Sequence, residues 1–178
     1  SALVWNKYKE NPQKYIDRLY GMSLHDSLGI EIPGEGKPYV KNTKDKSWSK
    51  VSLPFMSIGY ELKLTPLQTL SFYNAIANDG ELLRPRLIEE VREWNRTVQR
   101  FDKEVLNPAI CSPETVKKVQ KLLRNVVTEE HGTGHRLHSP YLSLAGKTGT
   151  AQKNYASRDP EKLAYISTFA GYFPAEDP

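Results

Sequence analysis

Apolar residues recur at helical spacing in several stretches of the chain, which predicts amphipathic helices. The first stretch runs from Val4 to Tyr20, and Asn11-Pro12 is expected to divide it into two short helices, because proline opens a helix but does not continue one. A later helix is expected to begin at Ser112, with Pro113 in its first turn. Its apolar stripe comprises Val116, Val119, Leu123, Val126 and Val127.

The clearest helix start lies between these two stretches. Thr65-Pro66-Leu67-Gln68 has the form of a capping box, in which Thr65 and Gln68 bond to each other's backbone amides. Gly80 follows Asn78-Asp79 and marks the expected end of this helix. We expect one apolar face, formed by Leu67, Leu70, Tyr73, Asn74 and Ala77.

Alternating and β-branched residues predict strands in the second half of the chain. Residues 86–94 and 97–101 are expected to form a hairpin around Asn95-Arg96. Residues 141–147 and 164–173 are expected to pair as antiparallel strands, joined by the polar segment 152–162, with the helix from Ser112 packed on one face. The predicted class is therefore α+β, an antiparallel sheet with packed helices.

The composition is that of a globular protein, and the charge argues against binding to nucleic acid. The chain has 178 residues, of which 38% are hydrophobic and 26% charged, and these values fit a globular protein. Its formal net charge is only +4, and carboxylates interrupt the lysines, so no nucleic-acid partner is expected. The densest lysine cluster, from Lys37 to Lys50, predicts a solvated loop, with an anion contact as the alternative. The single Cys111 allows no internal disulfide.

Two motifs suggest a metal site and a phosphate-binding loop, but the neighbouring residues argue against both. His131, His135 and His138 have a spacing that suits metal binding on a helix, but the glycines between them predict a turn, so no metal site is expected. Gly146-Lys147-Thr148 ends like a phosphate-binding loop, but Tyr141 stands where the first glycine is required. We therefore expect neither a metal nor an organic cofactor.

Lys147-Thr148-Gly149-Thr150 has different chemistry at the end of a predicted strand. A lysine ammonium and two threonine hydroxyls suit a carboxylate, and Gly149 lets a substrate backbone lie along the strand. Lys-Thr-Gly is also one of the signature motifs of β-lactamases and penicillin-binding proteins. Alone, such a short match is moderate support.

The surrounding motifs extend this match to most of the chain. They occur in the order Ser57-Ile-Gly-Tyr60, Leu64-Thr-Pro-Leu-Gln68, Ala75-Ile-Ala-Asn-Asp-Gly80, Gly132-Thr-Gly134, Ala145-Gly-Lys-Thr-Gly-Thr-Ala-Gln152 and Phe169-Ala-Gly-Tyr-Phe-Pro174. From about Trp5 to the last residue the chain resembles the class B penicillin-binding transpeptidases of the cell-division type, which cross-link peptidoglycan. The resemblance implies part of a β-lactamase/transpeptidase-like fold.

The resemblance also implies roles for the residues of this motif. Lys147 and Thr150 are the candidate catalytic residues, with Lys147 setting the charge of the site and the Thr150 amide forming half of an oxyanion hole. Thr148, Gly149 and Thr150 are the candidate substrate-binding residues. The implied substrate is a peptidoglycan stem peptide ending in D-Ala-D-Ala, the implied inhibitors are β-lactams, and the implied protein partners are other divisome proteins.

Two further motifs of the family are not found in positions that fit. There is no Ser-x-Asn, and the one Ser-x-x-Lys, Ser47-Trp-Ser-Lys50, lies in a predicted polar loop rather than at the start of a helix. Residues 1–178 are therefore expected to be the C-terminal portion of a transpeptidase domain, inactive alone. The parent is expected to be anchored in the bacterial cytoplasmic membrane with this domain on the periplasmic side. The alternatives are a β-lactamase or D,D-carboxypeptidase of the same superfamily, and a non-catalytic peptidoglycan- or divisome-binding module.

Overall fold

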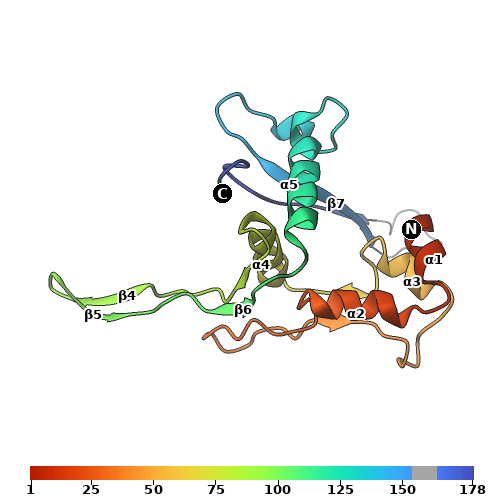
Figure 1. The fold of residues 1–178 in the computed structure, drawn as a ribbon, viewed down its shortest axis with the longest axis horizontal. Helices are drawn as coiled ribbons and strands as arrows, with labels where there is room; N and C mark the ends of the chain where they lie inside the picture. The colour runs from red at the N-terminus through yellow and green to blue at the C-terminus, as the bar shows by residue number, and fades with distance from the viewer. Residues whose placement is uncertain (154–163) are drawn as a thin grey trace. The chain divides into compact units, whose positions relative to one another are not determined.

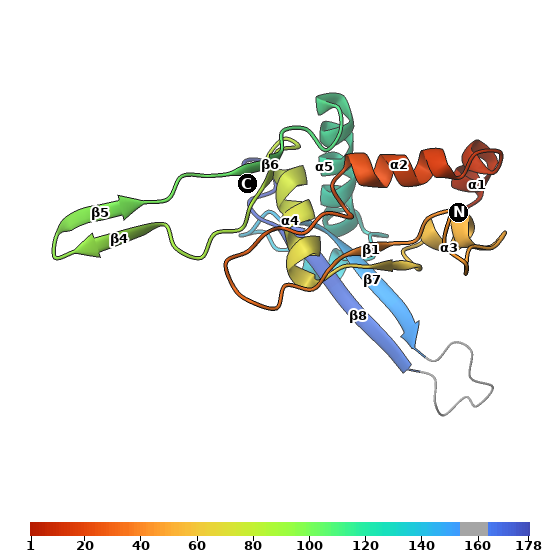
Figure 2. The same cartoon turned by 90° about the horizontal axis from the view of Figure 1, so that it is seen from below.

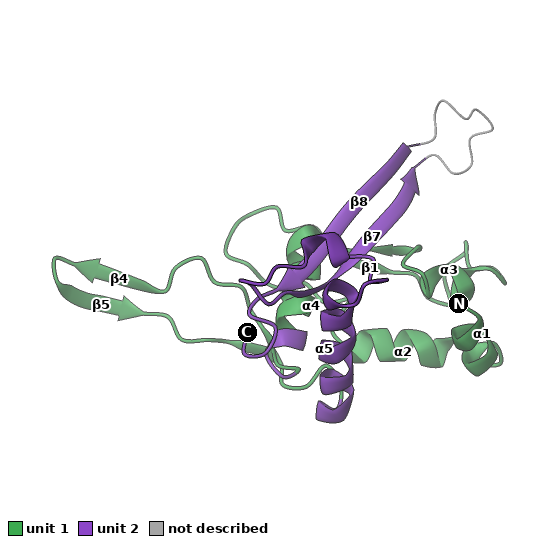
Figure 3. Ribbon diagram, turned by 90° about the horizontal axis from the view of Figure 1, so that it is seen from above, with its two compact units in different colours: residues 1–75, 80–111 green, residues 76–79, 112–178 purple. Residues whose placement is uncertain are grey.

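The structure is a computed structural model that describes residues 1–153 and 164–178. The chain divides into two compact units, coloured separately in Figure 3: unit 1 comprises residues 1–75 and 80–111, and unit 2 comprises residues 76–79 and 112–178. All described strands pair antiparallel, in four two-stranded sheets, so the expected α+β class is confirmed. Among the described helices, none combines the length and hydropathy needed to cross a membrane.

Unit 1 packs its N-terminal helices around a small apolar core (Figure 1). Its first elements are α1 (Ala2–Tyr8), α2 (Gln13–Gly21), β1 (Tyr39–Val40), α3 (Ser52–Met56), β2 (Leu62–Lys63) and α4 (Pro66–Ala77), the last of which continues into unit 2. The core joins Ile16 and Leu19 of α2 to Val40 of β1 and Met56 of α3. The break between α1 and α2 falls before Pro12 and Gln13, which confirms the predicted division into two helices.

Helix α4 begins with the predicted capping box. The Thr65 N–H donates to Gln68 Oε1 at 2.8 Å, and the Gln68 N–H donates to Thr65 Oγ1 at 3.1 Å. The helix ends before Gly80, which has a φ of 97° and donates its N–H to Ala75 O at 2.7 Å. Both ends of α4 therefore follow from local sequence.

The apolar face predicted for α4 is wrong in its orientation. Gln68, Ser71 and Ala75 are buried, whereas Leu70 is 54% exposed. The small Ser71 and Ala75 allow close packing, and Gln68 is held inside by a hydrogen bond from its Nε2 to Gly36 O at 3.3 Å. The buried face of α4 therefore contains the hydrogen-bonded Gln68 and not Leu70, which the helical periodicity had placed there.

The lysines of the segment from Lys37 to Lys50 are exposed, as predicted, with the exception of Lys41. Lys41 is only 7% exposed, and its Nζ lies 2.7 Å from Glu61 Oε2. The pairing of β1 with β2 brings these residues together, and the Lys41 N–H donates to Glu61 O at 3.3 Å. A buried ammonium needs such a carboxylate, and the carboxylate lies too far along the sequence for a local pattern to reveal it.

The hairpin predicted between residues 86 and 101 is confirmed, in a shorter form. Its strands are β4 (Glu90–Glu93) and β5 (Arg96–Arg100), so the turn is Trp94-Asn95 rather than Asn95-Arg96. Figures 1 and 2 show this hairpin extending away from the helices of unit 1. At its base, β3 (Leu82–Leu83) pairs with β6 (Val105–Asn107).

Unit 2 contains a long hairpin and the helix that packs on it. Its elements are α5 (Pro113–Thr128), the short 3₁₀ helix η1 (His135–Leu137), β7 (Ala145–Lys153) and β8 (Ala164–Tyr172). The antiparallel register runs from Ala145 opposite Tyr172 to Lys153 opposite Ala164, which confirms the predicted pairing. The predicted bounds of the first strand, 141–147, are wrong, because Tyr141 is 95% exposed and β7 begins at Ala145. Most of the predicted connection 152–162 lies outside the described residues.

Helix α5 packs against β7, as predicted. Ser112 caps it by accepting a hydrogen bond from the Thr115 N–H at 3.3 Å. Val116, Leu123 and Val127 are buried, whereas Val119 and Val126 are half-buried. The apolar stripe therefore lies close to where the helical period placed it, and it supports the strand that carries the lysine motif.

Candidate active site

The residues Lys147 to Thr150 lie within β7, where one edge of the strand is unpaired. The register places Lys147 opposite Ala170 and Thr150 opposite Ser167 of β8. No described strand pairs with the other edge of β7. Because side chains alternate along a strand, Thr148 and Thr150 leave the sheet on one face and Lys147 on the other. The motif therefore combines side chains with a backbone edge that an extended peptide can join.

A chain of hydrogen bonds links the lysine of this motif to two threonine hydroxyls. Lys147 Nζ donates to Thr148 O at 2.9 Å and to Thr148 Oγ1 at 3.3 Å. The Thr148 hydroxyl donates in turn to Thr133 Oγ1 at 2.7 Å. The ammonium thus lies beside the hydroxyl of its neighbour, although the two side chains leave opposite faces of the strand. A cation next to O–H donors is an arrangement that can bind a carboxylate.

Thr133 is held in place by the turn that follows α5. The Gly134 N–H donates to Val126 O at 3.0 Å, and the Gly132 N–H donates to Glu129 O at 2.8 Å. A Cβ atom at Gly132 would collide with the Val126 carbonyl oxygen, so this turn requires glycine there. The two glycines therefore fix the Thr133 hydroxyl next to the strand.

The packing of the hairpin favours a small residue at Gly149. A Cβ atom at this position would lie 2.6 Å from Thr168 Oγ1 of β8, the residue opposite it in the register. The sequence suggested a different reason, namely room for a substrate backbone. The structure adds the close approach of β8 as a second reason for glycine at this position.

The sheet beside the motif contributes no opposing charge. Strand β8 (Ala164–Tyr172) has the sequence AYISTFAGY, without a carboxylate or a cation. Burial raises the pKa of Tyr172, whose hydroxyl is buried and has no hydrogen-bond partner in the described part of the chain. Tyr172 therefore stays neutral, and Lys147 supplies the positive charge next to the threonines.

The structure brings together the predicted residues Lys147, Thr148, Gly149 and Thr150 on a single strand, and it adds Thr133. The sequence pointed to Thr133 only as the middle of Gly132-Thr-Gly134, which is one of the motifs of the family resemblance, and gave its hydroxyl no role. Its contact with Thr148 spans 15 residues of sequence, so no local periodicity could reveal it.

The other candidate residues of the sequence do not form a site. Ser47 and Lys50 are exposed and lie in turns, outside any described helix or strand. His135 and His138 stack, with ring centroids 5.6 Å apart, but the described residues contain no group of His, Cys, Asp and Glu side chains suited to a metal.

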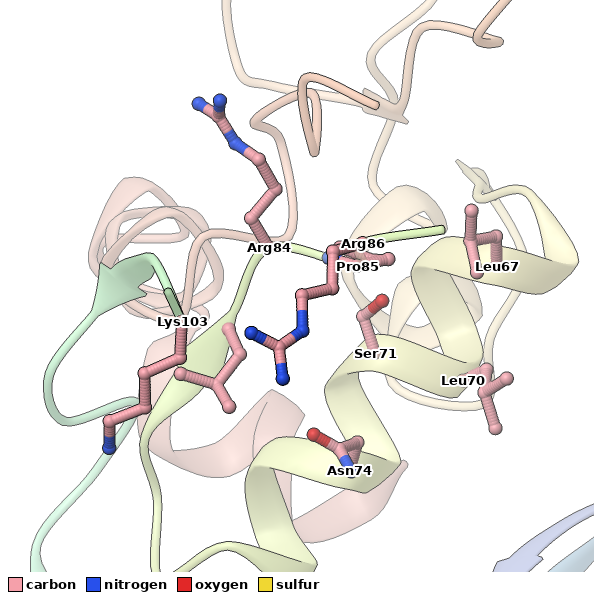
Figure 4. Close-up of a pocket in the computed structure, with 9 residues that line it drawn as sticks. Leu67, Leu70, Ser71, Asn74, Arg84, Pro85, Arg86 and Lys103 are labelled. Carbon is pink, nitrogen blue, oxygen red and sulfur yellow. The ribbon is translucent and has the colours of Figure 1, made fainter. Parts of the chain in front are cut away.

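A cavity of about 370 Å³ lies in unit 1, beside the exposed face of α4 (Figure 4). Its lining includes Leu67, Leu70, Ser71, Asn74, Leu83, Arg84, Pro85, Arg86 and Lys103. Each of the three cations already has a carboxylate partner: Glu104 for Arg84 at 2.9 Å, Glu89 for Arg86 at 3.6 Å, and Glu81 for Lys103 at 2.8 Å. The cavity therefore lacks the free charge found at Lys147.

Comparison with known proteins identifies the family. The family described as penicillin binding protein transpeptidase domain matches residues 7–178. The chain belongs to this family. Among the curated relatives, Penicillin-binding protein PbpB of Mycobacterium tuberculosis is 33% identical over 94% of this chain and 25% of its own length. The probable peptidoglycan D,D-transpeptidase FtsI of Caulobacter vibrioides is 31% identical over 93% of this chain and 26% of its own length.

Solved transpeptidase structures agree with this assignment. The structure of penicillin-binding protein 3 from M. tuberculosis complexed with aztreonam superposes with a TM-score of 0.72 at 32% identity, over 94% of this chain and 38% of that one. The transpeptidase domain of Burkholderia pseudomallei penicillin-binding protein 3 gives a TM-score of 0.72 at 27% identity, over 94% of this chain and 46% of that one. The fold is therefore the β-lactamase/transpeptidase fold expected from the sequence. The chain spans about a quarter of the length of the curated relatives it matches.

Proposed function

We propose that this chain forms the substrate-binding half of a peptidoglycan D,D-transpeptidase. The observation that carries the proposal is the open edge of β7, where Lys147 Nζ contacts the Thr148 hydroxyl at 3.3 Å. Membership of the transpeptidase family and the names of the relatives, which include peptidoglycan D,D-transpeptidases, support it. The substrate class is a stem peptide that ends in D-Ala-D-Ala.

The reaction forms an acyl-enzyme and then transfers the acyl group to an amine. A serine hydroxyl attacks the carbonyl carbon of the penultimate D-Ala, the peptide C–N bond breaks, and the terminal D-Ala leaves with a proton on its amine. An amine of a neighbouring stem peptide then attacks the ester and releases the serine. A β-lactam follows the first step only, because its leaving amine stays tethered to the acyl group. The attacking serine belongs to a Ser-x-x-Lys motif that we place outside residues 1–178.

The residues of β7 position the substrate for this attack. The hydroxyls of Thr148 and Thr150 donate to the terminal carboxylate, and the ammonium of Lys147 stabilises its charge. The backbone N–H of Thr150 donates to the oxyanion that forms on the attacked carbonyl, and loss of one such donor typically slows the reaction about 100-fold or more. Extended substrate backbone lies along the unpaired edge of β7.

The cellular setting is proposed from the family alone. The parent protein is anchored in the cytoplasmic membrane, the transpeptidase domain lies on its outer side, and other divisome proteins bind it. The name FtsI among the relatives supports a role in cell division.

A labelling experiment on the complete parent protein tests the proposal. A fluorescent penicillin is expected to label it stoichiometrically, and mass spectrometry is expected to place the adduct on the serine of Ser-x-x-Lys. Lys147→Ala should abolish labelling while leaving the fold intact, because Lys147 is exposed and its loss removes charge rather than packing. The matched control is Lys153→Ala, which removes the lysine at the other end of β7 and should label normally.

Three assays on the same complete parent protein, labelling, cephalosporin hydrolysis and D-Ala release, distinguish the alternatives. Rapid turnover of a chromogenic cephalosporin would favour a β-lactamase, and release of D-Ala without cross-linking would favour a carboxypeptidase. A parent that is not labelled at all would indicate a non-catalytic binding module. Equal labelling of Lys147→Ala and the parent would show that Lys147 is not the lysine of the motif.

A further inference from the structure

Another cavity of unit 1, of about 360 Å³, lies where the end of α1 meets the start of α3. Figures 1 and 2 show these two helices beside each other. The lining of the cavity includes Trp5, Lys9, Trp48, Ser49 and Lys50. Small-ligand sites typically have volumes of about 300–1,000 Å³, so this cavity is large enough for a small molecule.

Two tryptophans that are far apart in the sequence line this cavity. Trp5 belongs to α1, Trp48 lies in the segment that precedes α3, and both are half-buried. Trp48 also packs against the apolar core of unit 1. Neither indole makes a ring contact or a hydrogen bond with another described residue. The two indoles therefore offer a ligand both apolar surface and free N–H donors.

The positive charge of this cavity is not compensated within the described part of the chain. The ammonium groups of Lys9 and Lys50 form no hydrogen bond or ion pair with a described residue, and none of the described lining residues is acidic. The cavity beside α4 differs, because each of its three cations is paired with a carboxylate. Two unpaired ammonium groups at a concave surface attract an anion. Lys50 also belongs to the lysine cluster for which the sequence left an anion contact open.

The segment that carries Trp48 and Lys50 is held by its own hydrogen bonds. The Ser49 N–H donates to Ser52 Oγ at 3.1 Å, and the Ser52 N–H donates to Ser49 O at 3.0 Å. The Trp48 N–H donates to Asp45 O at 2.8 Å. A segment that is already ordered loses little conformational entropy when a ligand binds, so this arrangement favours binding.

The polar groups of the cavity are almost all hydrogen-bond donors. Ammonium and indole N–H groups only donate, and among the described lining residues only Ser49 has a side chain that can also accept. A metal ion or a quaternary ammonium ligand would meet like charges and no carboxylate. A sugar ring fits better, because its C–H groups pack on the electron-rich indole faces and its oxygens accept hydrogen bonds.

We propose that this cavity binds a saccharide that carries a carboxylate, with the sugar ring against Trp5 and Trp48 and the carboxylate at Lys9 and Lys50. The choice of a sugar over a nucleotide rests on the proposed function. The glycan strands of peptidoglycan contain muramic acid, whose carboxyl group is free where no stem peptide is attached. The lining supports the same choice, because adenine, guanine and cytosine present amino donors for which only the Ser49 side chain is an acceptor.

The test is a titration of the isotope-labelled chain with N-acetylmuramic acid, followed by the tryptophan indole signals in proton–nitrogen correlation spectra. The chain has three tryptophans, and Trp94, which is 95% exposed and lies outside this cavity, is an internal control. The signals of Trp5 and Trp48 should shift saturably, whereas the signal that Trp94→Phe removes should not. N-acetylglucosamine lacks the lactyl carboxylate, so it should bind about fivefold or more weakly.

Variants separate the roles of charge and stacking. Lys9→Gln/Lys50→Gln should weaken the binding of N-acetylmuramic acid about fivefold or more, to the level of N-acetylglucosamine. The matched control is Lys44→Gln/Lys46→Gln, which removes two exposed lysines outside the lining and should bind like the unmodified chain. Trp5→Ala should weaken the binding of both sugars, because it removes apolar surface without changing the charge. The backbone signals of each variant show whether the fold is retained.

Four results would overturn the proposal. These are the absence of a saturable shift at Trp5 and Trp48, equal affinity for the two sugars, equal losses in the two double-lysine variants, or undiminished binding by Trp5→Ala. Tighter binding of adenosine monophosphate than of N-acetylmuramic acid at the same signals would indicate a nucleotide site instead. The titration involves no acylation, so its failure would leave penicillin labelling of the parent intact, and a failure of labelling would leave sugar binding intact.

Discussion

At the scale of single residues, the Thr148 hydroxyl has two neighbours with opposite roles. Lys147 donates to it at 3.3 Å, and Thr133 accepts from it at 2.7 Å. When the Thr148 hydroxyl donates its hydrogen bond to a substrate carboxylate, the Thr133 hydroxyl can rotate and donate to Thr148 Oγ1 instead. The oxygen of Thr148 then remains hydrogen-bonded in both states, and the linked hydroxyls polarise each other.

Replacing Thr133 with valine should weaken acylation of the complete enzyme by penicillin about fivefold. Valine keeps the shape of threonine but removes the hydroxyl, and a net hydrogen bond contributes about 1 kcal/mol. The measurement is the second-order rate constant of acylation, resolved into binding and chemical steps. The loss should appear in binding, because the carboxylate is recognised there.

Two controls accompany this prediction. Thr133→Ser retains the hydroxyl and should acylate nearly as fast as the parent. A penicillin methyl ester lacks the carboxylate, so Thr133→Val should have little effect on its already slow reaction. An equal effect on the acid and the ester would mean that Thr133 acts only through the fold.

At the scale of secondary-structure elements, the C-terminal segment is tied to both α5 and the approach to β7. Glu176 accepts a hydrogen bond from the Ser143 hydroxyl at 2.7 Å, and its Oε1 lies 2.7 Å from Arg124 Nη2 of α5. The Ser143 hydrogen bond, together with the charge of Arg124, lowers the pKa of Glu176 below its ordinary value of 4.5. The folded state therefore favours the ionised carboxylate.

This shift predicts how the stability of unit 2 depends on pH. A depressed pKa gives stability that is present above the unfolded value of 4.5 and is lost as pH falls through the lower folded value. Urea unfolding midpoints should therefore decline on acidification more steeply for the unmodified chain than for Glu176→Gln. Parallel declines for the two proteins would show that Glu176 does not contribute to acid sensitivity.

The capping box of α4 gives a second prediction at this scale. Thr65→Ala should lower the free energy of unfolding by about 1 kcal/mol, because the Gln68 N–H loses its acceptor. Thr65→Ser keeps the oxygen and should be close to neutral. Chemical denaturation followed by circular dichroism measures both, and an equal loss for serine and alanine would contradict the capping role.

Features that depend on residues close in sequence could be predicted, whereas features that depend on residues far apart in sequence could not. The cap at Thr65, the break at Pro12 and the stripe of α5 each follow from residues within a few positions of one another. The buried pairing of Lys41 with Glu61 and the buried Gln68 depend on residues 20 and 32 positions away along the chain, respectively. The start of β7 was misplaced because residues 141–144 have strand-like composition without a partner strand.

The same distinction between close and distant residues applies to the candidate site. The motif from Lys147 to Thr150 could be located from sequence, because its residues are contiguous and chemically distinctive. The contribution of Thr133 could not, since it depends on how a glycine turn is placed beside the strand.

At the scale of the whole molecule, the chain corresponds to about a quarter of the length of its curated relatives. The proposed acyl-enzyme needs a serine at the start of a helix, with a lysine one turn away. Residues 1–178 offer only Ser47 and Lys50 at that spacing, both exposed in turns. Under the proposed function, substrate recognition and covalent chemistry therefore lie in different parts of the parent protein.

We therefore predict that residues 1–178 alone neither react with a fluorescent penicillin nor hydrolyse a chromogenic cephalosporin. A receptor for the carboxylate binds reversibly but supplies no nucleophile. Gel fluorescence and absorbance measure the two reactions, with the complete parent as the positive control. A stoichiometric adduct on Ser47 would refute the division of roles.

The long hairpin of unit 2 also has a consequence for how the chain behaves in concentrated solution. Strand β8 (Ala164–Tyr172) is uncharged, lacks proline and exposes Tyr165, Ile166 and Phe169, a composition that favours cross-β stacking between molecules. Its partner β7 has lysines at positions 147 and 153, and charged lysines discourage unwanted strand addition. Aggregation of the chain should therefore start at β8. At the open edge of β7, the charge of Lys147 disfavours the addition of a strand, and the same charge is proposed to attract the substrate.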